Sequence, residues 1–214
     1  MLQENLIFNK TDLEFNLDKF ESGTTNVMLV TGVSGSGKTT IAQELAAKYG
    51  CAHYQLDWLT DYIFGGCDIK ELLEEREHGL LTYIAKTGLE NTYTYDDFSE
   101  QELITIIRSY IKFLIAWCKM QSGKKFIIEG LQIYNTYQEG DTHITSCPII
   151  IKGTSGLVSA IRAAKRNDGA FLSNFGPLLK FLFSDNKKIK KLEKDLNASN
   201  SFAEEFKEYD TLWN

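Results

Sequence analysis

A glycine-rich pattern near the start of the chain constrains the fold more than any other feature. Residues 26–31 before it form a short apolar, β-branched run, which is typical of a buried strand. Residues 39–49 after it carry apolar side chains at helical spacing, and Gly50 is suited to end that helix. A strand before and a helix after favour a phosphate-binding loop over a plain glycine-rich turn. The pattern satisfies G-x-x-x-x-G-K-[ST] and reads Gly32-Val33-Ser34-Gly35-Ser36-Gly37-Lys38-Thr39.

The chemistry of phosphate binding explains this pattern. Its three glycines permit backbone angles that let successive N–H groups surround phosphate oxygens. The helix that begins near Lys38 adds the positive end of its dipole. Lys38 is expected to reach the β- and γ-phosphates, and the Thr39 hydroxyl to ligate Mg²⁺. We therefore expect ATP and Mg²⁺ as cofactors, and a nucleotide-binding set of Gly32, Val33, Ser34, Gly35, Ser36, Gly37, Lys38, Thr39 and Thr40.

The rest of the chain alternates short apolar runs with helical stretches. Ser99-x-x-Glu102 has the spacing of a capping box and predicts a helix that ends by Gly123. Such alternation predicts an α/β domain whose mostly parallel sheet has helices on both faces. Without repeats or a Pro-, Gly- or Ser-rich linker, we expect one domain over residues 1–214. Further strands are predicted at 52–56, 125–129 and 148–152, and further helices at 71–86, 157–166, 171–183 and 184–196.

Composition narrows the classes of function. The 214 residues include 23 Lys+Arg and 29 Asp+Glu, a net charge of -6, which argues against a nucleic-acid partner. The chain has no signal-peptide start and no apolar run near the roughly 18 residues of a spanning helix, so no membrane partner is expected. Four scattered cysteines are typical of reduced thiols, and we expect a cytoplasmic protein. Residues 148–194 differ from the average, with 10 Lys+Arg and 3 Asp+Glu, a net of +7.

A second motif, the guanine-reading N-K-x-D of GTPases, is matched by residues 9–12. It precedes the phosphate-binding loop, and the chain contains no D-x-x-G switch sequence. We interpret it as a chance tetrapeptide in a surface turn.

The chain resembles the small P-loop kinases: shikimate, gluconate, adenylylsulfate and uridine kinases and the zeta-type toxin kinases. The resemblance rests on residues 33–40, on Leu45-Ala46, on an acid after the second strand, and on residues 126–130. It implies a P-loop NTPase fold with a helical, substrate-side insertion over residues 58–122. These kinases have a fifth strand after the lid, whereas the end of this chain looks helical. Either residues 5–15 supply an edge strand, or the sheet is truncated there.

Two carboxylates are candidates for catalysis and metal binding. Asp57 follows the second strand, where the resembled kinases carry an acid that accepts the acceptor's hydroxyl proton or orients Mg²⁺. Asp61 is a substitute for this role, and the competing interpretation of Asp57 is a helix N-cap. Glu129 ends a strand at the sheet edge where open α/β folds bind ligands, so it is expected to bind Mg²⁺. Glu replaces the usual Asp, which leaves its role open between metal and substrate; a solvated acid is the alternative.

Arg162 and Arg166 are four residues apart, hence on one face of a predicted helix. The resemblance implies a basic helical lid over residues 153–196 that carries these arginines to the phosphates, where guanidinium groups offset charge in the transition state. A solvated basic face is the competing interpretation, and the lysine run at 187–191 is interpreted as such a face.

The function implied is transfer of the γ-phosphate of Mg-ATP to a small-molecule hydroxyl or a nucleotide. The acceptor pocket would lie in the insertion, where Arg76 and Arg108 are candidates to hold a substrate anion. The alternative is a nucleotide-binding regulatory or toxin–antitoxin-type protein without a metabolite acceptor. The sequence leaves the oligomeric state open. The expected catalytic set is Lys38, Asp57, Arg162 and Arg166.

Overall fold

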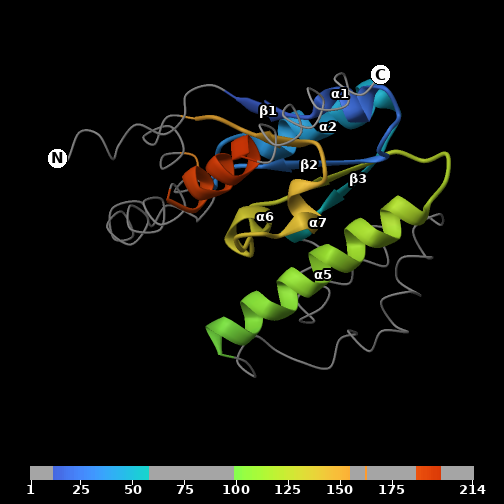
Figure 1. The fold of residues 1–214 in the computed structure, drawn as a ribbon. Helices are drawn as coiled ribbons and strands as arrows, with labels where there is room; N and C mark the ends of the chain where they lie inside the picture. Colours follow the sequence, from blue (N-terminus) through green and yellow to red (C-terminus); the bar gives the residue numbers. More distant parts are fainter. Residues whose placement is uncertain (1–11, 58–98, 155–161, 163–186, 199–214) are drawn as a thin grey trace, which may run out of the picture.

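A five-stranded sheet forms the centre of the protein, which we describe from a computed structural model covering residues 12–57, 99–154, 162 and 187–198 (Figure 1). The strand order is β1-β5-β2-β4-β3. Strands β2, β3, β4 and β5 are parallel to one another, and β1 pairs antiparallel with β5. The predicted α/β fold with a mostly parallel sheet is therefore confirmed. The strands are β1 (Leu13–Phe15), β2 (Val27–Thr31), β3 (Ala52–Gln55), β4 (Phe126–Glu129) and β5 (Ile149–Ile151).

Helices cover both faces of this sheet, as Figure 1 shows. On one face, α1 (Leu17–Glu21) and α2 (Lys38–Tyr49) pack over the sheet. The opposite face is covered by α5 (Glu100–Met120) and by the helical segment 187–198. Two single-turn helices pack on that same face, α6 (Gln132–Asn135) and α7 (Thr142–Thr145). Among the described helices, none is both long and apolar enough to cross a membrane.

Burial on both faces explains why the central strands are apolar at every position. In β2, Val27 and Leu29 join the core beneath α5, while Met28 and Val30 join the core beneath α2. The residues of β4 and β5 alternate between the two cores in the same way, because successive side chains of a strand point to opposite faces. The sequence patterns that predicted these strands are thus produced by a sheet buried between two layers.

The capping box predicted at the start of α5 is confirmed. The backbone N–H of Ser99 donates to Glu102 Oε2 at 2.8 Å, and the Glu102 N–H donates to Ser99 Oγ at 3.4 Å. These bonds satisfy N–H groups that the first turn of a helix leaves without partners. The predicted helix after the glycine-rich loop is confirmed as well, and Gly50 ends it with a left-handed φ of 62°.

The edge strand comes from the N-terminal part of the chain. β1 pairs with β5 in the register Leu13↔Ile151 and Phe15↔Ile149. Of the two sequence-based alternatives, the supply of an edge strand by residues 5–15 is therefore the one observed, over Leu13–Phe15.

The parallel strands end at the same edge of the sheet. Val30 and Gln55 are both register partners of Glu129, and Thr31 is the partner of Ile151. The segments that follow these parallel strands therefore all start at the same edge of the sheet, which we call the carboxyl edge.

Candidate functional site

The glycine-rich loop, residues 32–37, connects β2 to α2 at the carboxyl edge. Gly35 and Gly37 have φ of 77° and 91°, which side chains disfavour. A Cβ on Gly32 would lie 2.8 Å from Ser36 Oγ and 2.9 Å from the Lys152 carbonyl oxygen. Gly37 caps α2 without a side-chain hydrogen bond, so no capping side chain occupies the N–H groups of the first helical turn. The loop therefore combines close backbone packing with a helix start that has no capping side chain, and helix N-termini are places where anions bind.

Thr39 and Glu129 meet beneath this loop. The Thr39 hydroxyl donates to Glu129 Oε1 at 2.9 Å, across 90 residues of sequence. Glu129 is only 1% exposed, so this carboxylate is not the solvated acid of the competing interpretation. Two hydrogen bonds join the end of β4 to β2, from the Gly130 N–H to the Val30 carbonyl at 3.1 Å and from the Thr31 hydroxyl to the Gly130 carbonyl at 2.9 Å.

The donor set at this position suits a hard cation. A hydroxyl and a carboxylate are oxygen ligands, and Mg²⁺ is bound by few protein oxygens together with water and phosphate. Within the described ranges, no three His, Cys, Asp or Glu side chains cluster as a metal site would require. Thr39 and Glu129 could thus hold Mg²⁺ only together with oxygens from a bound ligand or water.

Asp57 lies at the same edge, beyond the end of β3. Its Oδ1 accepts a hydrogen bond of 2.5 Å from the Gln132 side-chain amide, at the start of α6. The interpretation of Asp57 as an N-cap is wrong, because Leu56 already has helical structure and Asp57 follows it. Asp61 lies outside the described residues. Gln132 was not among the predicted site residues, although its position shortly after a strand end was a usable signal.

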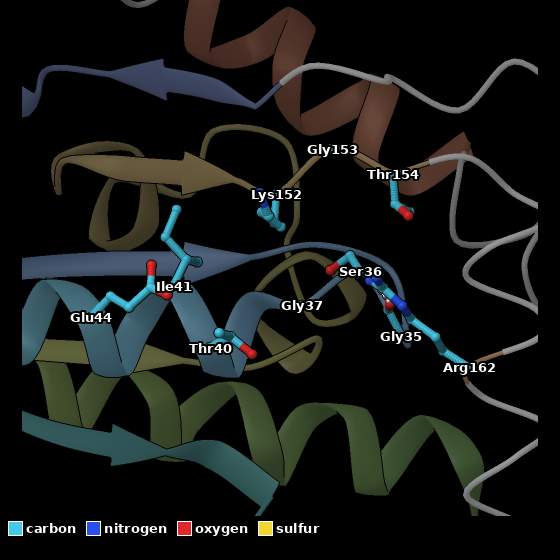
Figure 2. Close-up of a pocket in the computed structure, with 10 residues that line it drawn as sticks. All are labelled: Gly35, Ser36, Gly37, Thr40, Ile41, Glu44, Lys152, Gly153, Thr154 and Arg162. Atoms are coloured by element: carbon cyan, nitrogen blue, oxygen red, sulfur yellow. Dashed lines mark hydrogen bonds between the residues drawn. The ribbon is translucent and has the colours of Figure 1, made fainter.

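A pocket of about 560 Å³ opens beside the glycine-rich loop (Figure 2). One wall is the loop after β5, residues 152–154, and another is the start of α2 with Thr40, Ile41 and Glu44. Arg162 completes the lining and points back toward the glycine-rich loop, where its Nη1 donates to the Gly35 carbonyl at 3.4 Å. Lys38, at the opening of α2, is 6% exposed.

Some of the site residues predicted from the sequence line this pocket. Of the expected nucleotide-binding set, Gly35, Ser36, Gly37 and Thr40 line the pocket, together with one expected lid arginine. Arg166 and Arg76 lie outside the described residues. Lys152, Gly153 and Thr154 were not among the predicted site residues, even though Lys152 ends a predicted strand and the other two directly follow it.

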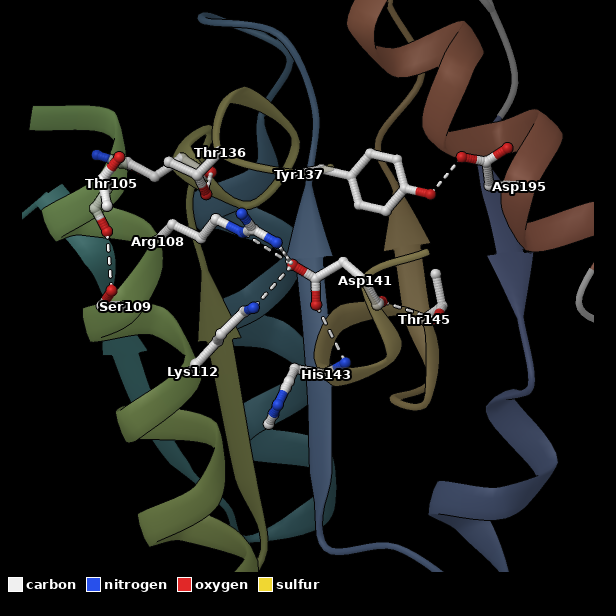
Figure 3. Close-up of polar contacts among 11 residues, drawn as sticks. Thr105, Arg108, Ser109, Lys112, Thr136, Tyr137, Asp141, His143, Thr145 and Asp195 are labelled. Atoms are coloured by element: carbon white, nitrogen blue, oxygen red, sulfur yellow. Dashed lines mark hydrogen bonds and ion pairs between the residues drawn. The ribbon is translucent and has the colours of Figure 1, made fainter. Parts of the chain in front are cut away.

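Arg108 has a different role from the one suggested by its sequence position (Figure 3). Its Nε and Nη2 atoms both lie 3.1 Å from Asp141 Oδ2, and Lys112 Nζ lies 3.5 Å from the same oxygen. Asp141 is fully buried at its side chain, and its Oδ1 accepts the His143 N–H at the start of α7. Arg108 therefore attaches α7 to α5 instead of holding a substrate anion.

The helical segment 187–198 is attached by its apolar face and by polar contacts, one of which is partly buried. The Tyr137 hydroxyl donates to Asp195, and burial together with this carboxylate raises the pKa of Tyr137 above its ordinary value (Figure 3). The lysines of the 187–191 run are exposed, as the solvated-face interpretation predicted. The buried side chains of the segment are Ile189, Leu192 and Leu196.

No protein-family model matches the chain, and no curated protein has a significantly similar sequence.

Proposed function

We propose that the chain is a P-loop kinase that transfers the γ-phosphate of Mg-ATP to a small-molecule hydroxyl or to a nucleotide. The observation that carries this proposal is the hydrogen bond from Thr39 to the buried Glu129 beneath the glycine-rich loop. It brings the two oxygen ligands expected for Mg²⁺ to the place where the loop would hold the β- and γ-phosphates. The strand order and the resemblance to small P-loop kinases support the same conclusion.

The triphosphate would be held mainly by backbone N–H groups and two cations. The glycine-rich loop and the first turn of α2 present N–H groups, and Lys38 adds a positive charge at the same end. Arg162 lines the adjacent pocket and would bind phosphate oxygens through its planar guanidinium group. Arg166 stays a predicted partner in this role.

Thr39 and Glu129 would hold Mg²⁺ together with phosphate oxygens. Bound Mg²⁺ would offset the charge on the β- and γ-phosphate oxygens. The Thr39 hydroxyl now donates to Glu129, and it would turn its oxygen lone pair toward the metal. Glu129 would then accept from a metal-bound water or ligate directly, and its burial keeps this carboxylate fixed.

Asp57 would activate the acceptor. The Gln132 amide donates to Asp57 Oδ1 and thereby fixes the orientation of the carboxylate, which leaves Oδ2 to accept the proton of the acceptor hydroxyl. The hydroxyl oxygen forms the new bond to phosphorus, the bond to the leaving ADP oxygen breaks, and the proton is taken up by the carboxylate. This arrangement favours a kinase over a regulatory protein that only binds nucleotide.

The test is ATP consumption with a panel of small hydroxyl compounds and nucleotides as acceptors, measured in the full chain and its variants. Lys38→Ala should lower turnover by about 100-fold or more, since it removes a cation that stabilises the transferring phosphoryl group. Lys48→Ala, which removes an exposed lysine from the end of the same helix, is the matched control and should retain turnover. Undiminished turnover in folded Lys38→Ala would refute the proposal.

Asp57→Asn separates the kinase from a nucleotide-binding regulator. We expect phosphoryl transfer to fall by about 100-fold while the affinity for Mg-ATP is unchanged, because the substitution removes a base but no nucleotide contact. A regulator without an acceptor would show the same slow ATP hydrolysis before and after the substitution.

A further inference from the structure

Asp12 binds one wall of the pocket described above. It lies immediately before β1, and its Oδ2 accepts a hydrogen bond of 2.7 Å from Lys152 Nζ. Its Oδ1 accepts a second bond of 3.0 Å from the Gly153 backbone N–H. The two carboxylate oxygens thus hold a side chain and the backbone of the same loop.

We propose that Asp12 is a positioning residue for nucleotide binding, because it fixes residues 152–154 as the wall of the nucleotide pocket. The inference rests on the proposed function of this pocket. It assigns a role to a residue of the N-K-x-D tetrapeptide, which the sequence analysis interpreted as a chance match in a surface turn.

The antiparallel pairing of β1 with β5 brings this carboxylate to the pocket. Leu13 is the register partner of Ile151, so one step further along both strands Asp12 is opposite Lys152. One strand runs toward the carboxyl edge and the other away from it, and the residue before β1 therefore meets the residue after β5. This geometry places the Asp12 carboxylate beside a loop that is distant in the sequence. The Asp12–Lys152 bond joins residues 140 positions apart.

The tethered loop also contacts the glycine-rich loop. The Lys152 N–H donates to the Thr31 carbonyl at 2.7 Å. The Lys152 carbonyl oxygen and Cβ would lie 2.9 and 3.2 Å from a Cβ on Gly32. A shift of Lys152 would therefore change both the wall of the pocket and the packing of the first glycine in the loop.

The ion pair is sheltered enough to fix this position. The side chains of Asp12 and Lys152 are 28% and 27% exposed, so water and salt screen their attraction only in part. Hydrogen bonds between charged partners are stronger than neutral ones. A wall that is already in place needs no ordering when a ligand binds, which raises the affinity of the site.

The test compares Mg-ATP affinity and steady-state kinetics in the full chain. Asp12→Ala removes both acceptors and should weaken Mg-ATP binding by about tenfold, as expected for the loss of a charge-assisted contact. The KM for ATP should rise by a similar factor while kcat changes little, because the groups proposed for chemistry are not altered. Glu14→Ala, which removes an exposed carboxylate from the neighbouring strand, is the matched control and should bind Mg-ATP like the original chain.

A second variant keeps the test decisive if Asp12→Ala folds poorly. Asp12→Asn retains one acceptor oxygen for the Gly153 N–H but loses the charge and the second oxygen that accepts from Lys152. Its affinity should therefore lie between those of the original chain and Asp12→Ala. Unchanged or tighter Mg-ATP binding in both folded variants, even with a lower melting temperature, would overturn the positioning role.

Lys38→Ala separates this inference from the proposed function. If the original chain binds Mg-ATP and Lys38→Ala does not, unchanged binding in the Asp12 variants refutes the positioning role alone. If the original chain does not bind Mg-ATP, the proposed function and the positioning role both fail.

Discussion

At the scale of single residues, Gly130 is required by contacts that permit no side chain. A Cβ at this position would lie 2.6 Å from the Gln132 side-chain oxygen and 2.7 Å from Leu56 Cβ. Both distances are shorter than van der Waals contact, and Leu56 is fully buried in the closely packed core. The glycine after Glu129 thus lets the end of β4 come close to Leu56, which precedes Asp57, and to Gln132, which donates to Asp57.

Gly130→Ala should lower the free energy of unfolding by about 1 to 3 kcal/mol, the usual effect of overpacking a core. It should also reduce phosphoryl transfer, because Leu56 and Gln132 must shift and Asp57 depends on both. Urea unfolding and ATP consumption measure the two effects.

Gly140→Ala is the control for a general effect of substituting glycine. Gly140 has open space around its Cβ position but a left-handed φ of 77°, so alanine there should cost about 1 kcal/mol of stability without loss of activity. Equal effects of the two substitutions on activity would contradict the argument for Gly130.

At the scale of elements, β3 carries a histidine that should make the stability of the protein depend on pH. His53 Nε2 is buried without a hydrogen-bond partner among the described residues, and burial lowers the pKa of His53 below its ordinary value of 6.5. The unfolded chain therefore binds this proton at a higher pH than the folded chain. The contribution of neutral His53 is fully present above pH 6.5 and is lost as the pH falls from there to the folded-state pKa.

His53→Gln removes this titration. Urea unfolding from about pH 7.5 to pH 5 should give a steeper loss of stability in the original chain than in the variant, so the difference between the two decreases on acidification. Parallel stability curves over this range would contradict the prediction.

The elements differ in how far the sequence could predict them. β2, β4 and β5 were predictable because burial on both faces makes them continuous apolar runs, and α5 because its capping box is a local signal. β1 has only three residues and owes its structure to pairing with β5, so its bounds could not be read from periodicity. The helices α6 and α7 have four residues each, about one turn, which is too short to show a helical pattern in the sequence.

At the scale of the whole molecule, the candidate site is formed by contacts between distant parts of the chain. The glycine-rich motif was predictable because its eight residues, 32–39, are contiguous, and Glu129 because a strand end in a parallel sheet lies at the ligand edge. The pairing of Gln132 with Asp57 spans 75 residues, and that of Gly153 with Asp12 spans 141. Such partners are brought together by the order of the strands in the sheet, which could not be predicted from the sequence.

The sheet order also predicts which strands unfold locally first. β2 is fully buried and has paired neighbours on both sides, β5 and β4, whereas β1 is an edge strand of three residues with an exposed Glu14. Because local opening exposes edges before centres, backbone amides of β2 should exchange hydrogen most slowly and those of β1 fastest among the strands. Hydrogen exchange read by mass spectrometry measures this order, and equal protection of β1 and β2 would contradict it.

Added Mg-ATP should slow exchange in the glycine-rich loop and in residues 152–154, while β1 amides beyond Asp12 change less. Protection confined to the glycine-rich loop would mean that the loop after β5 is not part of the nucleotide pocket.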